Sequence, residues 1–220
     1  RLDAELLLSS LTGWARTSFR TGPERQPPAR VLTEFQGLVQ RRVAGEPVAY
    51  LLGQQEFWSL PLAVNASTLI PRPDTECLVE AALELPVAGQ ARVLDLGTGT
   101  GAIALALASE RPGWVVRACD CQHQAVELAT RNAVALGLPV TVILSNWFAQ
   151  LPPETYDLIV SNPPYVAAQD PHLNLGDVRF EPASALVSGA DGLDDIRYLV
   201  SAAPARLKNG GWLLLEHGYD

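Results

Sequence analysis

The sequence predicts an α/β protein, in which a parallel, doubly wound sheet follows a small helical region. From residue 91 onward, short apolar runs alternate with helical patterns, as is typical of parallel strands joined by crossover helices. Before residue 56, apolar residues recur at helical spacing. The charge divides at the same place, because residues 1–56 carry a net charge of +1 and residues 57–220 carry −9. We therefore expect two modules of different character.

The first module is predicted from two segments with helical periodicity. Residues 2–13 and 30–44 each carry apolar side chains on one face and end next to a glycine, which favours a helix end. Residues 56–73 then change to aromatic and branched residues around a turn-forming asparagine, which indicates a β-hairpin. The predicted organisation is a helical N-terminal domain, a hairpin linker and an α/β domain, over residues 1–54, 55–70 and 71–220.

The α/β module is expected to contain five strands with helices between them. The strands are predicted from buried apolar runs at residues 91–96, 114–120, 139–145, 156–160 and 210–218. Amphipathic or glycine-initiated patterns predict helices at residues 74–85, 97–110, 124–137 and 194–207. This alternation requires a parallel sheet, whose ligand sites lie at the carboxyl ends of the strands.

Composition excludes several classes of protein. The chain has a net charge of −8 and an isoelectric point near 4.9, with Lys208 as its single lysine, so we expect no direct binding to nucleic acid. No apolar run is long enough to cross a membrane. Three cysteines lack metal-ligand spacing, so we expect reduced thiols and no metal site. A cytoplasmic monomer is the expectation.

The stretch DLGTGTG, residues 95–101, is the first candidate binding element. Three of its glycines, Gly97, Gly99 and Gly101, follow a strand and open a helix, where backbone can approach a ligand closely and free N–H groups face it. Asp120 ends the next strand, where an acid can accept both hydroxyls of a ribose. These residues predict a ribose-containing cofactor, and their spacing differs from that of NAD-binding loops. A tight structural turn and a surface acid are the alternatives.

Two further polar segments follow the third and fourth strands. Asn146 and Trp147 are suited to frame an adenine, although a Trp after a strand more often belongs to the core. Residues 162–165 read Asn-Pro-Pro-Tyr, and the two prolines have no N–H, so this backbone offers mainly acceptors. The residue before a proline is kept extended. Such a fixed array of acceptors suits a planar NH2 group, with Tyr165 as a stacking surface.

This array also predicts a mechanism. An amide nitrogen is a poor nucleophile because its lone pair is delocalised. Holding both of its protons on acceptors favours a pyramidal nitrogen whose lone pair can attack, which is catalysis by orientation and preorganised electrostatics. Asn162 and the carbonyl of Pro163 are the expected acceptors, and Tyr165 is expected to pack on the amide plane. No Ser, His or Cys nucleophile is required.

Four segments carry a resemblance that covers nearly the whole chain: residues 47–80, which include IPRPDTE, residues 94–108, SNPPY at 161–165 and RFEPASAL at 179–186. Together they resemble the HemK/PrmC-type protein-(glutamine-N5) methyltransferases, which modify the glutamine of the Gly-Gly-Gln motif in bacterial peptide-chain release factors. The IPRPDTE and RFEP stretches are the more specific, because many amine-directed methyltransferases share the other two.

The resemblance implies S-adenosylmethionine as methyl donor and release factors as partners. It also implies an N-terminal substrate-recognition domain followed in sequence by a Rossmann-like methyltransferase domain. It implies cofactor contacts by Gly97, Thr98, Gly99, Thr100, Gly101, Asp120, Asn146, Trp147 and Asn162. It implies that the substrate amide is bound by Asn162, Pro163, Pro164 and Tyr165. The family often has Asp where this chain has Asn146, and it continues past Asp220 with an antiparallel strand pair, so C-terminal strands are expected to be missing here.

Two other functions stay open at this level. An N6-adenine nucleic-acid methyltransferase also acts on a planar NH2 group, but it needs a basic groove, and the acidic charge counts against it. A catalytically idle cofactor-binding adaptor is the third possibility, and the intact Asn162–Tyr165 array argues against it. The loop at Arg179–Pro182 fits either closure over a substrate or simple packing.

Overall fold

A computed structural model describes residues 1–22 and 24–218, and it confirms the predicted fold class. The central sheet is parallel and has the strand order β5-β4-β3-β6-β7. Its strands are β3 (Arg92–Leu96), β4 (Val115–Asp120), β5 (Thr141–Leu144), β6 (Tyr156–Ser161) and β7 (Leu207–Leu215). The order reverses between β3 and β6, which is where open α/β sheets bind ligands.

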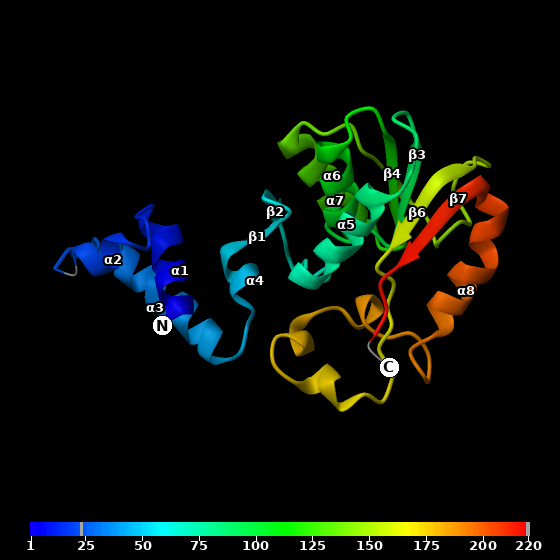
Figure 1. The fold of residues 1–220 in the computed structure, drawn as a ribbon. Helices are drawn as coiled ribbons and strands as arrows, with labels where there is room; N and C mark the ends of the chain where they lie inside the picture. The colour runs from blue at the N-terminus through cyan, green and yellow to red at the C-terminus, as the bar shows by residue number, and fades with distance from the viewer. Residues whose placement is uncertain (23, 219–220) are drawn as a thin grey trace.

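Helices cover both faces of the sheet (Figure 1). One face carries α5 (Glu76–Glu84), α6 (Ala102–Glu110) and α7 (His123–Leu136), and the other carries α8 (Asp194–Ala202). Two buried apolar clusters correspond to these two layers, and they meet at the central strands β3 and β6. Seven consecutive residues of α6 are buried, because this helix lies between the sheet and its neighbours.

Several element ends differ from the predicted ones for local reasons. The predicted helix at 74–85 begins with a 3-10 turn, η1 (Pro73–Thr75), before α5. The predicted helix at 194–207 stops at Ala202 and continues as η5 (Ala203–Arg206), which contains a proline in its first turn. The last strand was predicted at 210–218, but β7 spans Leu207–Leu215, because pairing with β6 starts earlier and shifts register near Tyr156.

The N-terminal region contains α1 (Leu2–Thr12), α2 (Ser18–Thr21), α3 (Ala29–Val43) and α4 (Val48–Leu52). The two short helices were not predicted, since four or five residues are too few to show periodicity. A hairpin of β1 (Gln54–Phe57) and β2 (Leu60–Ala63) follows, and it is shorter than the predicted linker. No helix within residues 1–22 and 24–218 is long and apolar enough to span a membrane. The division into three domains stays a prediction.

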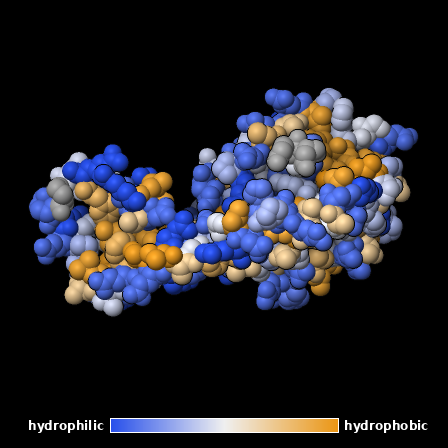
Figure 2. Space-filling view, turned by 90° about the horizontal axis from the view of Figure 1, so that it is seen from below, coloured by the Kyte–Doolittle hydropathy of each residue, from blue (hydrophilic) through white to orange (hydrophobic). Residues whose placement is uncertain are grey.

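A long segment, residues 166–193, leaves the sheet after β6 and returns to α8; we call it the 166–193 loop. It contains η2 (Pro171–Asn174), η3 (Val178–Phe180) and η4 (Ala183–Ala185), and Val166 pairs with Val187 to close it. Figure 1 shows it in yellow and orange beyond the carboxyl ends of the strands. Arg42 at the end of α3 donates to Asp177 Oδ1 at 3.0 Å, so the loop also contacts the helical region. Figure 2 shows the helical region and the α/β region as two lobes joined by a narrow waist.

Candidate functional site

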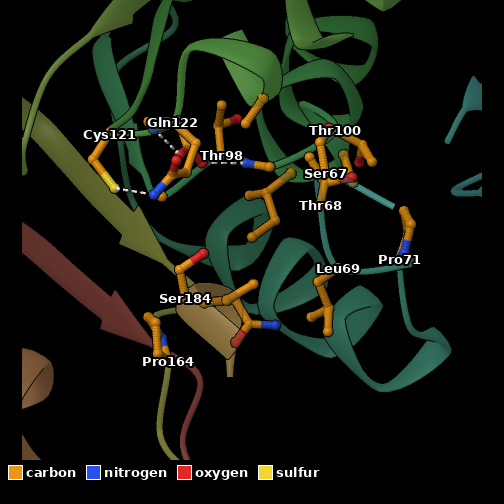
Figure 3. A pocket seen from close by; sticks show the side chains of 18 of the residues that line it. Ser67, Thr68, Leu69, Pro71, Thr98, Thr100, Cys121, Gln122, Pro164 and Ser184 are labelled. Carbon is orange, nitrogen blue, oxygen red and sulfur yellow. Dashed lines mark hydrogen bonds between the residues drawn. The ribbon is translucent and has the colours of Figure 1, made fainter. Parts of the chain in front are cut away.

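A cavity of about 230 Å³ lies at the carboxyl ends of β3, β4 and β6. Figure 3 shows Pro164 and Ser184 on the side of the cavity opposite Thr98 and Gln122, with Leu69 and Pro71 on a third side. The walls come from six separate parts of the chain: residues 67–75, 97–103, 120–125, 145–147, 162–164 and 184–195. The strand-end position predicted from the sequence is therefore the position of a cavity that several of the predicted residues line.

The glycine-rich turn forms one wall of this cavity and is held from below by Asp95. Thr98 Oγ1 donates to Asp95 Oδ2 at 2.5 Å, and the backbone N–H of Ala104 donates to the same oxygen at 3.2 Å. Asp95 has no exposed surface, and burial raises the pKa of its carboxyl to about 7. Its side chain does not line the cavity. Asp95 thus stabilises the turn that connects β3 to α6.

Four of the five residues of the glycine-rich turn, Gly97–Gly101, line the cavity, and the fifth does not. Gly97, Thr98, Gly99 and Thr100 line the cavity, and Gly101 does not. A Cβ on Gly97 would lie 3.4 Å from the Trp147 ring, which is an ordinary van der Waals contact, so it is the φ of +70° that favours glycine at this wall position. A Cβ on Gly101 would lie 3.0 Å from Leu105 and 3.3 Å from Ala129. Gly101 therefore serves helix packing, while its predicted cofactor contact has no counterpart in the cavity wall.

Asp120, Asn146 and Trp147 all line the same cavity. Asp120 accepts from the Gly99 N–H at 3.0 Å and from the Gln122 N–H at 2.9 Å, one on each oxygen. Each carboxylate oxygen keeps a further lone pair for a ligand, and burial raises the pKa of this carboxyl. The Trp147 indole donates to Asp195 Oδ1 at 3.2 Å, so α8 fixes the ring from the far side.

The Asn-Pro-Pro-Tyr segment begins where β6 ends. Ser161 closes the strand by donating to the Leu96 carbonyl at 2.6 Å. Asn162 and Pro164 line the cavity, whereas Pro163 and Tyr165 do not. The Tyr165 hydroxyl donates to Glu216 Oε1 at 3.1 Å, and burial raises the pKa of this phenol to about 12. The structure thus brings two of these four residues to the cavity and holds the tyrosine behind it.

Several wall residues were not identified from the sequence. Thr68, Arg72 and Thr75 enter the cavity wall from the segment that follows the hairpin, and Ser184 enters from the 166–193 loop. Asn162 Nδ2 donates to Thr75 Oγ1 at 3.1 Å. Only the unusual IPRPDTE pattern signalled this segment, and it did not indicate which side chains would face inward.

The two most specific sequence stretches meet at Glu181. Its side chain is fully buried, pairs with the Arg72 guanidinium at 2.5 Å and accepts from the Ile70 N–H at 2.9 Å. Burial raises the pKa of this carboxyl despite the neighbouring guanidinium. The loop at Arg179–Pro182 is therefore packed against the segment that carries Arg72, which fixes the guanidinium at the cavity wall.

The cavity fits the cofactor that the resemblance implies. The Thr68 hydroxyl is buried at the wall and has no hydrogen-bond partner in the described part of the chain, so a ligand group can satisfy it. Asp120 offers two acceptor oxygens for a ribose, and the backbone at Gly97–Thr100 is bare of large side chains on that side. Among residues 1–22 and 24–218, no cluster of His, Cys, Asp and Glu is placed to hold a metal ion.

Comparison with known proteins assigns both parts of the chain. Residues 73–190 match the family model "Methyltransferase small domain", and residues 1–53 match "PrmC N-terminal domain". A release factor glutamine methyltransferase of Pseudomonas aeruginosa is 59% identical over all of this chain and 80% of its own length. Proteins of the same name from Salmonella typhimurium and Escherichia coli are 54% and 51% identical, with the same coverage.

Solved structures with a similar fold are more distant in sequence. The hMettl16 catalytic domain aligns with a TM-score of 0.55 and 19% identity, over 69% of this chain and 60% of that domain. A methyltransferase from Pyrococcus furiosus aligns with a TM-score of 0.52 and 19% identity, over 81% of this chain and 76% of that protein. These similarities establish the methyltransferase fold and nothing finer.

Proposed function

The chain belongs to the release factor glutamine methyltransferase family, and we propose that it methylates the side-chain amide nitrogen of the glutamine in the Gly-Gly-Gln motif of peptide-chain release factors. The methyl donor in this proposal is S-adenosylmethionine. The observation that carries the proposal is the position of Asn162 at the wall of the cavity that also contains Asp120 and the glycine-rich turn. An acceptor for an amide and a site for a nucleoside thus share one cavity.

S-adenosylmethionine supplies an electrophilic methyl group on its sulfonium. On the protein side, we assign the backbone of Gly97–Thr100 to the amino-acid and ribose part of this cofactor, and Asp120 to the ribose hydroxyls. Trp147 and Asn146 border the remaining space and are assigned to the adenine. The unpartnered Thr68 hydroxyl at the same wall supports a polar ligand there.

The substrate amide is assigned to the segment 162–165. Asn162 lines the cavity, and its Oδ1 is assigned to accept one amide proton, while the carbonyl of Pro163 is assigned to accept the other. Pro164 at the wall is assigned to the amide plane, and Tyr165, which lies outside the cavity wall, is not assigned a contact with the amide. With both protons held, the nitrogen lone pair can attack in line. The methylated nitrogen is briefly cationic and strongly acidic, so water can accept its proton without a dedicated base.

The helical region, residues 1–54 in the predicted division, is proposed to help recognise the protein substrate. Its contact with the 166–193 loop supports this role, since Arg42 binds Asp177 and the Ala44 carbonyl accepts from Arg179 at 2.8 Å. The same loop reaches the cavity through Ser184. A release factor bound to the helices would therefore lie next to the cavity. We further propose that the protein acts as a monomer in the cytoplasm, where its substrate is found.

The test is a transfer assay with the purified chain, labelled S-adenosylmethionine and a full-length release factor. We expect incorporation of label, with mass spectrometry locating one added methyl group on the glutamine of Gly-Gly-Gln. A release factor whose motif glutamine is replaced by alanine is the matched control and should take up no label. Label on DNA or RNA, or on another residue of the release factor, would instead assign a different substrate.

A further inference from the structure

We propose that Thr75 and Glu216 determine substrate specificity by binding the two side-chain donors of the 162–165 segment, so that the side chains of this segment present only acceptors to the substrate NH2 group. This inference rests on the proposed function, because it concerns how the same segment distinguishes an amide from other groups. Neither residue belongs to the segment, and neither was identified from the sequence.

The segment contains few donors to begin with. Pro163 and Pro164 have no N–H, so the backbone of the segment donates only through Asn162 and Tyr165. Its side chains add two donors, the NH2 group of Asn162 and the hydroxyl of Tyr165. If either donor faced the substrate, it would oppose the NH2 group of a glutamine and would attract the carboxylate of a glutamate. Selectivity for an amide therefore requires that both donors are bound elsewhere.

Thr75 binds the first donor. Its hydroxyl oxygen accepts from Asn162 Nδ2 at 3.1 Å, across 87 residues of sequence. Thr75 is 5% exposed and lies at the end of η1, at the wall of the cavity. A carboxamide has two orientations related by a half turn, and a hydroxyl can accept or donate. We assign the orientation in which Nδ2 meets Thr75 and Oδ1 remains free for the substrate.

Glu216 binds the second donor. It directly follows β7, and its own N–H donates to the Ser161 carbonyl at 3.0 Å, which sets it beside the start of the segment. Its Oε1 accepts from the Tyr165 hydroxyl at 3.1 Å, and its Oε2 is buried with no other partner in the described part of the chain. A tyrosine phenol is protonated at neutral pH, and burial raises the pKa of Tyr165 further, so its hydroxyl is a donor that needs an acceptor.

The experiment measures how strongly the full chain prefers a Gly-Gly-Gln release factor over the isosteric Gly-Gly-Glu variant. The readout is the ratio of the two equilibrium affinities, obtained by competition in the presence of S-adenosylhomocysteine, so no turnover is needed. We expect Glu216→Ala to lower the ratio about tenfold, because it frees the Tyr165 hydroxyl. Thr75→Val should lower it by a similar factor, and Thr75→Ser, which keeps the hydroxyl, should restore it.

Two further variants separate a freed donor from lost charge or lost packing. Glu216→Gln removes the charge but keeps an acceptor for Tyr165, so the ratio should stay within about threefold of the wild-type value. The double variant Glu216→Ala with Tyr165→Phe has no hydroxyl to free, and it should regain the ratio that Glu216→Ala loses. The proposal is overturned if the double variant is no more selective than Glu216→Ala, or if Thr75→Val leaves the ratio unchanged. Failure of the wild-type chain to methylate Gly-Gly-Gln would contradict the proposed function instead, which is a separate result.

Discussion

The two halves of the cavity are built in different ways. The half around the glycine-rich turn is local, since Asp95 binds Thr98 three residues away and Ala104 nine residues away. The half around Asn162 is assembled from distant segments, with 87 residues between Asn162 and Thr75 and 109 between Arg72 and Glu181. A short motif can therefore specify the turn at the cofactor wall, although Asp120 and Trp147 complete that wall from later strands. The substrate wall depends on the correct packing of the whole fold.

The comparison predicts that a substitution in one half affects cofactor affinity and a substitution in the other affects the rate of transfer. The largest effect is expected at Asn162. Asn162→Ala removes the acceptor assigned to the amide, so the rate of methyl transfer should fall by roughly a thousandfold or more. The affinity for S-adenosylmethionine should stay within about threefold, as measured by calorimetry. An equal loss of affinity and rate would show that Asn162 acts mainly on the cofactor, against the role proposed here.

The next effect concerns Asn132, which joins the end of β2 to the glycine-rich turn. Asn132 in α7 is 2% exposed, and its amide bonds both the N–H and the carbonyl of Ala63 and the carbonyl of Thr100, at 2.9 to 3.0 Å. Asn132→Ala leaves these buried groups unpaired, so the free energy of unfolding should fall by about 2–3 kcal/mol. Asn174→Ala at the exposed η2 is the control for urea denaturation and should change it by no more than about 0.5 kcal/mol.

The buried carboxyl of Asp95 makes the local half sensitive to pH. Burial raises its folded-state pKa to about 7 from an ordinary value of 3.8, so the folded protein binds this proton more tightly than the unfolded chain. The resulting stabilisation is present below about pH 4 and is lost as the pH rises through 7. Between pH 5.5 and 8.5 the wild type should lose about 1–2 kcal/mol more stability than Asp95→Asn. Parallel pH profiles of the two proteins in denaturation experiments would contradict this assignment.

The smallest predicted effect concerns Gly97, where alanine would add both backbone strain, because φ is positive, and a Cβ at the cavity wall. Gly97→Ala and Gly137→Ala place a Cβ at nearly the same backbone angle, with φ of +70° and +66°. Both should lower the melting temperature, but only Gly97 lines the cavity, so only its Cβ would meet a bound cofactor. We expect about a tenfold weaker affinity for S-adenosylmethionine in Gly97→Ala, which is about 1.4 kcal/mol, and no change in Gly137→Ala. Similar affinities in both variants would mean that the contact has no effect.

The same contrast explains what could be predicted from the sequence. Alternating apolar runs and helical patterns predicted the five strands of the sheet, because each run is local and strongly periodic. Strand ends then located Asp120, Trp147 and Asn162 at one edge. The DLGTGTG stretch also contains Asp95, but the sequence did not indicate that this carboxyl would be buried beneath the turn and bound to Thr98.

The remaining parts of the site depend on tertiary contacts. Three side-chain pairs could not be predicted from sequence spacing: Thr75 with Asn162, Glu181 with Arg72, and Glu216 with Tyr165. Each pair is brought together by the sheet order and the 166–193 loop. The short helices α2 and α4 lacked enough residues for a periodic signal. Gly101 matched the binding motif but packs on Leu105 and Ala129, because one motif serves both the turn and the helix.

The separation of the two halves is tested most directly by the single-turnover rate of methyl transfer as a function of S-adenosylmethionine concentration, measured side by side for Gly97→Ala and Asn162→Ala. At saturating cofactor, Gly97→Ala should recover the wild-type rate within about threefold, because it affects cofactor binding alone. Asn162→Ala should remain at least about a hundredfold slower at every concentration, since its defect lies at the substrate amide. Recovery of Asn162→Ala at high cofactor, or a persistent rate defect in Gly97→Ala, would contradict a cavity with separable halves.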